Sequence, residues 1–261
     1  MSTFLIDVGN TRIKWARLTR GGVLQRQRAS TYAAWTARDV DATVFGRTQA
    51  IDRVVAVSVA PASITEAVRA AARARGIADV SFVESARRLG AVTTRYAEPW
   101  RLGADRLVAA IGAFAIAGRR GACLVDVGTA MTVDLVDSQG VHRGGAIIPG
   151  PQLMVSSLLE ETDGIGKRAV PSAARRRRPA AREFFVRATR DAIETGARFA
   201  AAAAIDRAVL ESRASLGHMP LVLLTGGAAP LVAPLLRTPR VRHVPDLVLQ
   251  GLAVLAKTPL R

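Results

Sequence analysis

Two stretches of the chain place an aspartate, a glycine and a small hydroxyl residue directly after a short apolar run. The first covers Asp7–Thr11 and the second covers Asp126–Thr129. An apolar run followed by such a loop predicts a buried strand that turns tightly into a second strand. Glycine lets backbone amides approach an oxyanion closely, threonine offers a hydroxyl, and aspartate can hold a cation or its waters. Two such loops indicate two similar half-molecules that face one polyphosphate.

The first loop has the side chains that phosphate binding requires. Gly9 permits close approach, and Asn10 and Thr11 can donate hydrogen bonds. Arg12 and Lys14 share one face of the expected strand, and either could meet phosphate oxygens while the other is a surface charge. The candidate phosphate-binding residues here are Asp7, Val8, Gly9, Asn10, Thr11, Arg12 and Lys14.

Asp7 itself has two interpretations. It could hold Mg²⁺ through a water molecule, or it could serve only to hydrogen-bond its own turn. A third glycine turn, Thr225–Ala228, follows the apolar run 221–224. Taken alone it is typical of an ordinary strand-to-helix turn.

Composition indicates a folded protein of the reducing cytosol. The chain has 261 residues, 49% hydrophobic and 22% charged, which is enough to form a core in two lobes. Cys123 is the single cysteine, so no disulfide can form within the chain, and we expect a buried, inert thiol. The N-terminus shows no signal-peptide pattern, and prolines and glycines interrupt the longest uncharged stretch, 214–236, so no membrane span is expected.

The net charge of +16 could indicate an anionic partner such as nucleic acid. Lysine occurs only at positions 14, 167 and 257, so nearly all of the 37 basic residues are arginines scattered along the chain. The aromatic content of 5% offers few surfaces on which bases could stack. Both observations argue against dedicated nucleic-acid binding.

Alternating and helical apolar patterns predict an α/β protein. Strands are expected over 3–7, 12–18, 23–27, 53–58, 80–83, 122–126, 131–136, 144–148, 221–224 and 241–244, with a turn at 137–140. Helices are expected over 33–39, 64–75, 103–118, 152–159, 184–209 and 247–256. The strands at 3–7 and 122–126 carry the two glycine loops at their ends, and the helix at 103–118 opens with Gly-Ala-Asp-Arg.

The segment Tyr96-Ala97-Glu98-Pro99-Trp100-Arg101-Leu102-Gly103-Ala104-Asp105-Arg106 closely resembles type III pantothenate kinases, also labelled Bvg accessory factor-like. The likeness extends to Asp7–Lys14, Ser58–Pro61, the Asp126-x-Gly-Thr-Ala loop, Gly144–Gly150, Thr189–Ile193 with Gly196, and Thr225–Gly227. This family is part of the superfamily of actin, hexokinase and the heat-shock chaperone ATPases.

The resemblance implies two similar actin-like (ribonuclease H-like) lobes with an ATP cleft between them, residues 1–119 and residues 120–261. It implies a cytoplasmic homodimer that phosphorylates the 4′-hydroxyl of pantothenate with ATP, the first step toward coenzyme A. The implied cofactors are Mg²⁺ with ATP and a monovalent cation, K⁺ or NH₄⁺.

The resemblance also assigns site residues. It makes Asp105 the general base, although a carboxylate that opens a helix is commonly a cap. It places Tyr96, Gly103, Ala104, Asp105, Arg106 and, from the second lobe, Thr189 around pantothenate. It places Gly128, Thr129, Gly226 and Gly227 at ATP, with the last two against the adenosine, and Asp126 at the monovalent cation.

Two other functions stay open from the sequence. Another small-molecule kinase or phosphatase of the superfamily would share the paired loops but would not need Tyr-x-x-Pro before Gly-Ala-Asp-Arg. A transcription-associated accessory factor would need a groove-reading helix, and the sequence contains no convincing helix-turn-helix. The Walker A pattern is absent, and His142, His218 and His243 have no metal-ligand spacing, so we expect them at the surface or in turns.

Arg175–Arg178 are four consecutive arginines between prolines. Their burial without partners would be very costly, so they predict a solvated loop. Such a loop could attract ATP, an acidic vitamin or nucleic acid, or it could have no dedicated role.

Overall fold

The computed structural model describes residues 2–46, 50–169 and 182–257 of the chain. The chain divides into two compact units. The first unit contains residues 1–119, 136–144 and 246–261, and the second contains residues 120–135 and 145–245. The assignment of 1–119 and 120–261 to two actin-like lobes stays a prediction.

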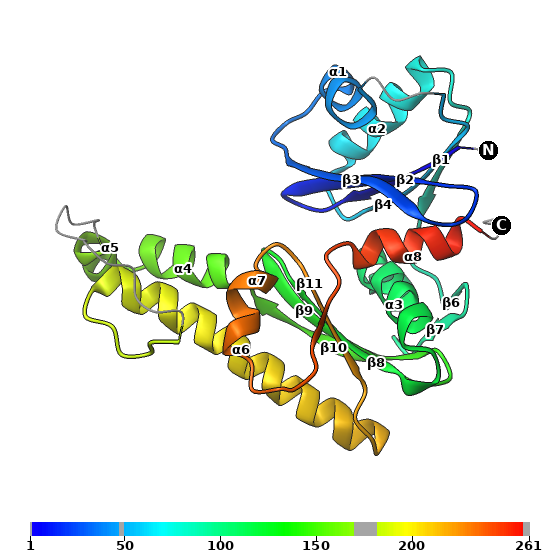
Figure 1. Ribbon diagram of the computed structural model, residues 1–261. Coiled ribbons are helices and arrows are strands. Elements are labelled where there is room, and N and C mark those ends of the chain that lie inside the picture. Colours follow the sequence, from blue (N-terminus) through cyan, green and yellow to red (C-terminus); the bar gives the residue numbers. More distant parts are fainter. Residues whose placement is uncertain (1, 47–49, 170–181, 258–261) are drawn as a thin grey trace. The chain divides into compact units, whose positions relative to one another are not determined.

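The first unit is built on a five-stranded mixed sheet in the order β3-β2-β1-β4-β5 (Figure 1). The strands are β1 (Thr3–Val8), β2 (Arg12–Leu18), β3 (Leu24–Thr31), β4 (Arg53–Ser58) and β5 (Asp79–Val83). The pairs β1–β2 and β2–β3 are antiparallel, whereas β1–β4 and β4–β5 are parallel. The order therefore places β1, which ends at the first glycine loop, in the centre of the sheet.

One face of this sheet packs against α1 (Ala37–Val40), the π-helical turn Asp41–Phe45 that continues it, and α2 (Ala62–Ala74) (Figure 1). The helix expected over 33–39 begins later because Thr36 caps it. The Thr36 side chain accepts from the Asp39 backbone N–H, and the Asp39 carboxylate accepts from the Thr36 backbone N–H, which is a capping box.

The first unit also contains α3 (Ala104–Ala117) and α8 (Leu247–Leu255), which cross at two glycines. A Cβ atom on Gly112 would lie 2.6 Å from the Leu247 carbonyl oxygen, and one on Gly251 would lie 1.9 Å from the Val108 carbonyl oxygen. Only glycine at these positions allows so close an approach of the two backbones.

The second sheet has the order β12-β11-β8-β9-β10-β7-β6. Its strands are β6 (Arg88–Leu89), β7 (Val92–Thr94), β8 (Ala122–Val127), β9 (Ala130–Val136), β10 (Val141–Pro149), β11 (Leu221–Thr225) and β12 (Arg242–His243). The hairpin β6–β7 and the start of β10 belong to the first unit. This hairpin was not predicted, because its two strands are too short to show an alternating pattern.

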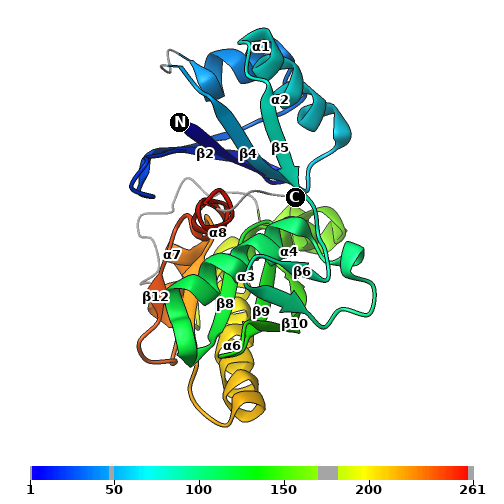
Figure 2. The ribbon, with the colours of Figure 1, turned by 90° about the vertical axis from the view of Figure 1, so that its right-hand side faces the viewer.

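In the second unit, α6 (Thr189–Leu216) lies along β8, β9 and β11 (Figure 2). The other helices are α4 (Pro151–Glu160), α5 (Asp163–Arg168) and α7 (Ala229–Val232). The long helix expected over 184–209 is shifted toward the C-terminus and ends at Gly217, which has a left-handed backbone (φ 75°). Within the described ranges, no helix combines the length and apolarity that crossing a membrane requires.

Candidate active site

The first glycine loop, at the β1–β2 turn, is tightly closed. The Gly9 backbone N–H donates to the Arg12 carbonyl (2.9 Å), and a Cβ atom on Gly9 would lie 3.2 Å from the same oxygen. The hydroxyl of Tyr32, which follows β3, donates to the Gly9 carbonyl. The loop is therefore held both by its own backbone and by a tyrosine twenty-three residues away.

Asp7 and Lys14 are directly opposite each other in the β1–β2 register. Opposite residues of an antiparallel pair share a face, and Arg12 lies on the same face as Lys14 two residues along β2. Asp7 is buried (8% exposed), whereas Asn10, Thr11 and Arg12 are exposed. A carboxylate and two cations thus share one face at the end of the strands, beside the exposed residues Asn10 and Thr11 of the loop.

The second glycine loop, at the β8–β9 turn, has a similar backbone closure. Gly128 N–H donates to the carbonyl of Ala130, two residues ahead (3.1 Å), whereas in the first loop Gly9 N–H donates to the carbonyl of Arg12, three residues ahead. Gly150 N–H also donates to the Thr129 carbonyl (2.9 Å). A Cβ atom on Gly150 would lie 2.1 Å from the Gly128 carbonyl oxygen, so only glycine fits against this loop.

The turn after β11 lies directly beside the second loop, because Thr225 is paired with Asp126 in parallel register. Gly226 has a left-handed backbone (φ 96°), and a Cβ atom there would lie 2.4 Å from the Asp126 Oδ1 atom. The Ala228 N–H donates to the Val127 carbonyl (2.9 Å). The second unit thus brings Asp126, the Gly128–Thr129 loop and the Gly226 turn together.

The segment Tyr96–Arg106, whose last three residues begin α3, forms a second cluster, in the first unit. The Arg106 guanidinium donates to the Tyr96 hydroxyl (3.0 Å) and lies 5.8 Å from the centre of that ring. Arg106 is buried (7% exposed), and Tyr96 is half-buried. The chain therefore folds a cation and a phenol from separate segments into one site wall.

Asp105 lies in the first turn of α3 but is not its cap, because the N-cap residue is Gly103. The Asp105 Oδ1 atom accepts from the Arg106 backbone N–H (2.8 Å). A Cβ atom on Gly103 would lie 2.7 Å from this oxygen, so glycine there makes room for the carboxylate. Tyr96 thus lies beside the segment Gly103–Arg106, and the binding of pantothenate by these residues stays a prediction.

His142 stacks on Tyr96, and the prediction that it lies at the surface or in a turn is wrong. His142 is fully buried instead of lying at the surface, and its ring stacks on Tyr96 with centroids 5.9 Å apart. Its Nδ1 atom is 3.0 Å from the Thr94 hydroxyl oxygen, which also accepts from the Tyr96 backbone N–H (3.2 Å). Arg87 donates to the carbonyls of Thr94, Tyr96 and Ala97. These contacts fix the position of Tyr96.

Other predicted residues lie elsewhere. Thr189 is the first residue of α6 and is half-buried, in the second unit. Arg175–Arg178 lie outside the described residues. Cys123 is fully buried, and this burial raises the pKa of its thiol, as expected for an inert cysteine.

No group of three or more His, Cys, Asp or Glu side chains in the described part of the chain could hold a metal ion by itself. A single carboxylate, such as that of Asp7 or Asp126, suits Mg²⁺ or a monovalent cation that takes its remaining ligands from phosphates and water. The donor set therefore fits a cation that arrives with a nucleotide.

Four supporting residues were not predicted from the sequence. Tyr32 and Gly150 support the two glycine loops, and Thr94 and His142 support Tyr96. Tyr32 is distant in sequence from Gly9, and His142 is distant from Thr94 and Tyr96, so no local spacing reveals them. Thr94 is only two residues from Tyr96, but its own contact with His142 joins distant parts of the chain. Gly150 could have been found, because it ends the Gly144–Gly150 motif whose likeness was recognised.

Comparisons with known proteins agree with this geometry. The profile of the family described as "Type III pantothenate kinase" matches residues 3–211. Type III pantothenate kinase of Aromatoleum aromaticum is 42% identical over 97% of this chain and 97% of its own length. That of an Azoarcus species is 39% identical over 97% of this chain and 89% of its own length.

Among solved structures, the activator of the 2-hydroxyisocaproyl-CoA dehydratase from Clostridium difficile, with bound ADPNP, has a TM-score of 0.56. The match covers 98% of this chain and 94% of the activator at 15% identity. A likeness at this identity establishes the fold alone, an α/β fold with two mixed sheets of the actin-like ATPase type.

Proposed function

The chain belongs to the type III pantothenate kinase family and is a pantothenate kinase of coenzyme A biosynthesis, and we propose that Asp105 is the general base of its reaction. The observation that carries this proposal is the connected set Asp105–Arg106–Tyr96, in which a carboxylate adjoins a buried cation and a phenol. This set is the part of the sequence that a polyphosphate-binding relative with another substrate would not need.

A primary alcohol attacks phosphorus readily only when its proton has an acceptor. In the proposed step, one Asp105 oxygen takes the proton of the 4′-hydroxyl as the alcohol oxygen bonds to the γ-phosphorus of ATP. The bond from the γ-phosphorus to the bridging oxygen breaks, and ADP leaves. The Arg106 amide, which donates to Asp105 Oδ1, orients the carboxylate for this task.

Arg106 and Tyr96 are proposed to bind pantothenate itself. The buried guanidinium suits the carboxylate or the amide oxygens of the substrate. The Tyr96 ring offers an apolar wall, and its hydroxyl holds Arg106 in place. Thr189 is proposed as a further substrate contact, supplied by the second unit.

The two glycine loops are proposed to bind the phosphates of ATP. In the first loop the exposed Asn10 and Thr11 donate to phosphate oxygens, with Lys14 or Arg12 neutralising their charge. In the second, Gly128 and Thr129 do the same, and Gly226 with Gly227 lies against the adenosine. Phosphoryl transfer depends mainly on such positioning and charge neutralisation.

Two cations complete the proposal. Asp7 would hold the Mg²⁺ of ATP through water, and the ion would supply positive charge next to the transferred phosphoryl group. Asp126 would hold a monovalent cation, K⁺ or NH₄⁺.

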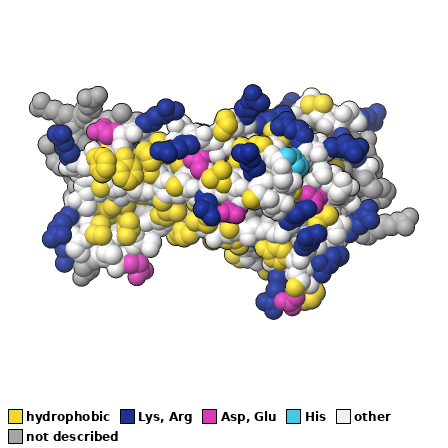
Figure 3. Space-filling model, turned by 90° about the horizontal axis from the view of Figure 1, so that it is seen from below, with side chains coloured by type: hydrophobic (Ala, Val, Ile, Leu, Met, Phe, Trp, Pro, Cys, Tyr) yellow, Lys and Arg dark blue, Asp and Glu magenta, His cyan; other side chains and the backbone are white. Residues whose placement is uncertain are grey.

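We also propose that the protein is a cytoplasmic homodimer. Of the exposed large hydrophobic side chains in the described residues, all except Val23 and Trp100 belong to the second unit. Phe184 and Phe185, 52% and 85% exposed, stack edge-on next to Phe199 of α6. Figure 3 shows hydrophobic side chains gathered at the α4–α6 end of the face in view. Such patches usually mark a partner surface.

The experiment that tests the general base compares Asp105→Asn with Asp79→Asn. Asp105→Asn should lower kcat by about 10²–10⁴, the usual contribution of a general base, with ATP affinity and Tm little changed. Asp79→Asn removes the same charge at the start of β5 and should leave kcat within about two-fold. A near-normal kcat for Asp105→Asn would show that Asp105 is structural and that the base lies elsewhere.

A further inference from the structure

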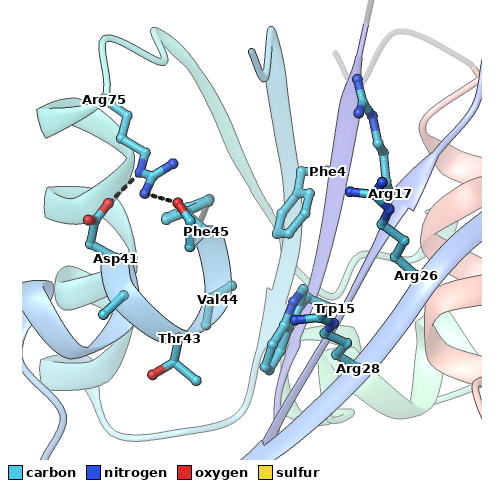
Figure 4. A pocket seen from close by; sticks show the side chains of 12 residues that line it. Phe4, Trp15, Arg17, Arg26, Arg28, Asp41, Thr43, Val44, Phe45 and Arg75 are labelled. Atoms are coloured by element: carbon cyan, nitrogen blue, oxygen red, sulfur yellow. Dashed lines mark hydrogen bonds and ion pairs between the residues drawn. The ribbon is translucent and has the colours of Figure 1, made fainter. Parts of the chain in front are cut away.

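The first unit contains a pocket of about 570 Å³ that the kinase reaction does not use. One wall consists of strand side chains and the other of the α1 region and the end of α2 (Figure 4). The strand wall is lined by Phe4, Trp15, Arg17, Arg26 and Arg28. The opposite wall includes Asp41, Thr43, Phe45 and Arg75. The volume is within the range of small-molecule sites, about 300–1,000 Å³.

This pocket is separated from the proposed kinase site by the sheet itself. Phe4 is paired with Arg17 in the β1–β2 register, and Trp15 is two residues from Arg17. Side chains alternate along a strand, so these three point to the face opposite that of Asp7 and Lys14. A ligand in the pocket would therefore not contact the Asp7–Lys14 face.

The charge of the lining favours an anion. It contains four arginines and one aspartate, a formal net charge of +3. The aspartate is already engaged, because the Arg75 guanidinium donates to Asp41 and also to the Gly46 carbonyl (2.5 Å). The hydrogen bond from Arg75 lowers the pKa of Asp41, so this pair stays ionised and neutralises itself. On the strand wall, the Arg17 Nε–H donates to the Ser2 hydroxyl (3.0 Å), and the exposed Arg26 and Arg28 face the pocket.

The sheet is irregular where Arg17 and Arg26 line the pocket. The β2–β3 register shifts between Trp15 and Arg17, and Arg26 on β3 has a left-handed backbone (φ 52°). A bulge of this kind redirects side chains, and non-glycine residues adopt such a backbone rarely. Arg26 and Arg28, two residues apart on β3, line the pocket from one strand, and Arg17 lines it from the next. Both Arg26 and Arg28 are exposed, and no ion pair within the described residues involves either one.

The base of the pocket is aromatic. Phe4, Trp15 and Phe45 are 3%, 6% and 0% exposed, so their rings are fixed by the core, and Phe4 and Phe45 lie 5.6 Å apart. Phe45 therefore supports the wall from behind, and only the edges of Trp15 and Phe4 are accessible. Fixed aromatic edges next to cations suit a ligand with a flat apolar part and a negatively charged part. Simple phosphate would use only the cations.

We propose that this pocket, lined by Trp15, Arg26 and Arg28, is a second binding site for a small organic anion with a flat apolar group, such as an aryl phosphate or aryl carboxylate. Its place on the face opposite Asp7 and Lys14 makes it separate from substrate binding. The anionic group meets Arg26 and Arg28, and the flat group packs against the accessible edges of Trp15 and Phe4.

The test is titration calorimetry of the full chain with 1-naphthyl phosphate, in the presence of saturating ATP and Mg²⁺ without pantothenate. Inorganic phosphate and 1-naphthol serve as probes for the charge alone and the ring alone. We expect saturable binding of 1-naphthyl phosphate, at least about ten-fold tighter than either probe.

Variants then locate the bound ligand. Arg26→Gln with Arg28→Gln should weaken binding at least about ten-fold, while Arg119→Gln with Arg120→Gln, an equal loss of exposed charge elsewhere, should leave it within about two-fold. Thr43→Trp, which fills the pocket from an exposed position without changing charge, should also weaken it. Unchanged Tm values would show that the variants fold.

Three results would overturn the proposal. The first is absence of saturable binding at millimolar concentration. The second is equal weakening by the Arg119 and Arg120 control, which would indicate a non-specific charge effect. The third is binding that Arg26→Gln with Arg28→Gln and Thr43→Trp both leave intact.

Discussion

At the scale of single residues, the two tyrosines of the chain each support one part of the proposed site. The Tyr32 hydroxyl donates to the Gly9 carbonyl of the first glycine loop, and the Tyr96 hydroxyl accepts from Arg106 in the proposed pantothenate pocket. The sequence identified Tyr96 through its motif but gave no sign of Tyr32. Each tyrosine can be changed to phenylalanine with the loss of one oxygen atom only.

The two substitutions should therefore each weaken the binding of a different substrate. Tyr96→Phe should raise the KM for pantothenate roughly 10–150-fold, because a hydrogen bond to a charged group contributes about 1.5–3 kcal/mol. Tyr32→Phe should instead raise the KM for ATP, by a smaller factor, because its partner is neutral. Steady-state kinetics with each substrate varied in turn would check this. Equal changes in both KM values for both variants would contradict the separate roles.

At the scale of elements, glycines allow the close backbone contacts that support the proposed site. Gly251 of α8 meets the Val108 carbonyl of α3, the helix whose first turn carries Asp105. Gly226 and Gly150 press against the second loop in the same way. The sequence predicted a turn at Gly226 and placed Gly150 at the end of a family motif, but nothing in it marked Gly251, because the contact joins helices far apart in the chain.

Gly251→Ala should destabilise the protein by about 1–3 kcal/mol or more, because its methyl group would overlap a backbone carbonyl that cannot move without shifting a helix. The control is Gly196→Ala in α6, where a Cβ atom would meet nothing within 4 Å. That change should be neutral or stabilise by about 0.5–1 kcal/mol, since alanine favours helix. Thermal unfolding of both variants would measure the difference, and similar Tm values would disprove the close crossing.

Much of the fold could be predicted from the sequence, and the reasons are local. The strands β1, β2, β4, β8 and β11 and the helices α2, α3, α4 and α8 lie within a few residues of expectation, because their apolar patterns are long or regular. The hairpin β6–β7 and the late start of α1 were missed, since short strands and a Thr36 capping box give weak patterns.

Only part of the candidate site could be predicted from the sequence. Motif residues such as Asp105 and Arg106 could be predicted, and the structure brings them together with Tyr96. The burial of His142 could not be predicted, because it depends on the pairing of β10 with β7 and on a ring stack with Tyr96.

At the scale of the whole molecule, the exposed apolar side chains of the second unit are the feature that one chain leaves unexplained. They suit a homodimer, and resemblance to the family suggests that Thr189 reaches the site of the partner chain. This can be tested by mixing two inactive variants. Thr189→Glu suits the first turn of a helix but would repel the anionic substrate.

If Thr189 acts across the dimer, each heterodimer of Asp105→Asn with Thr189→Glu should regain one working site. The expected activity of purified heterodimers is about half that of the wild type, whereas either variant alone is nearly inactive. Differently tagged subunits and sedimentation would establish that heterodimers formed. An active monomer would contradict the dimer, and inactive heterodimers would confine the site to one chain.

The most direct measurement is a coupled assay of the purified protein with ATP, Mg²⁺ and pantothenate, run with and without K⁺ or NH₄⁺. The account predicts ADP release that requires pantothenate, accompanied by an equal amount of 4′-phosphopantothenate detected by mass spectrometry. It also predicts faster release with the monovalent cation present. ADP release that is independent of pantothenate, or no release under any of these conditions, would contradict it.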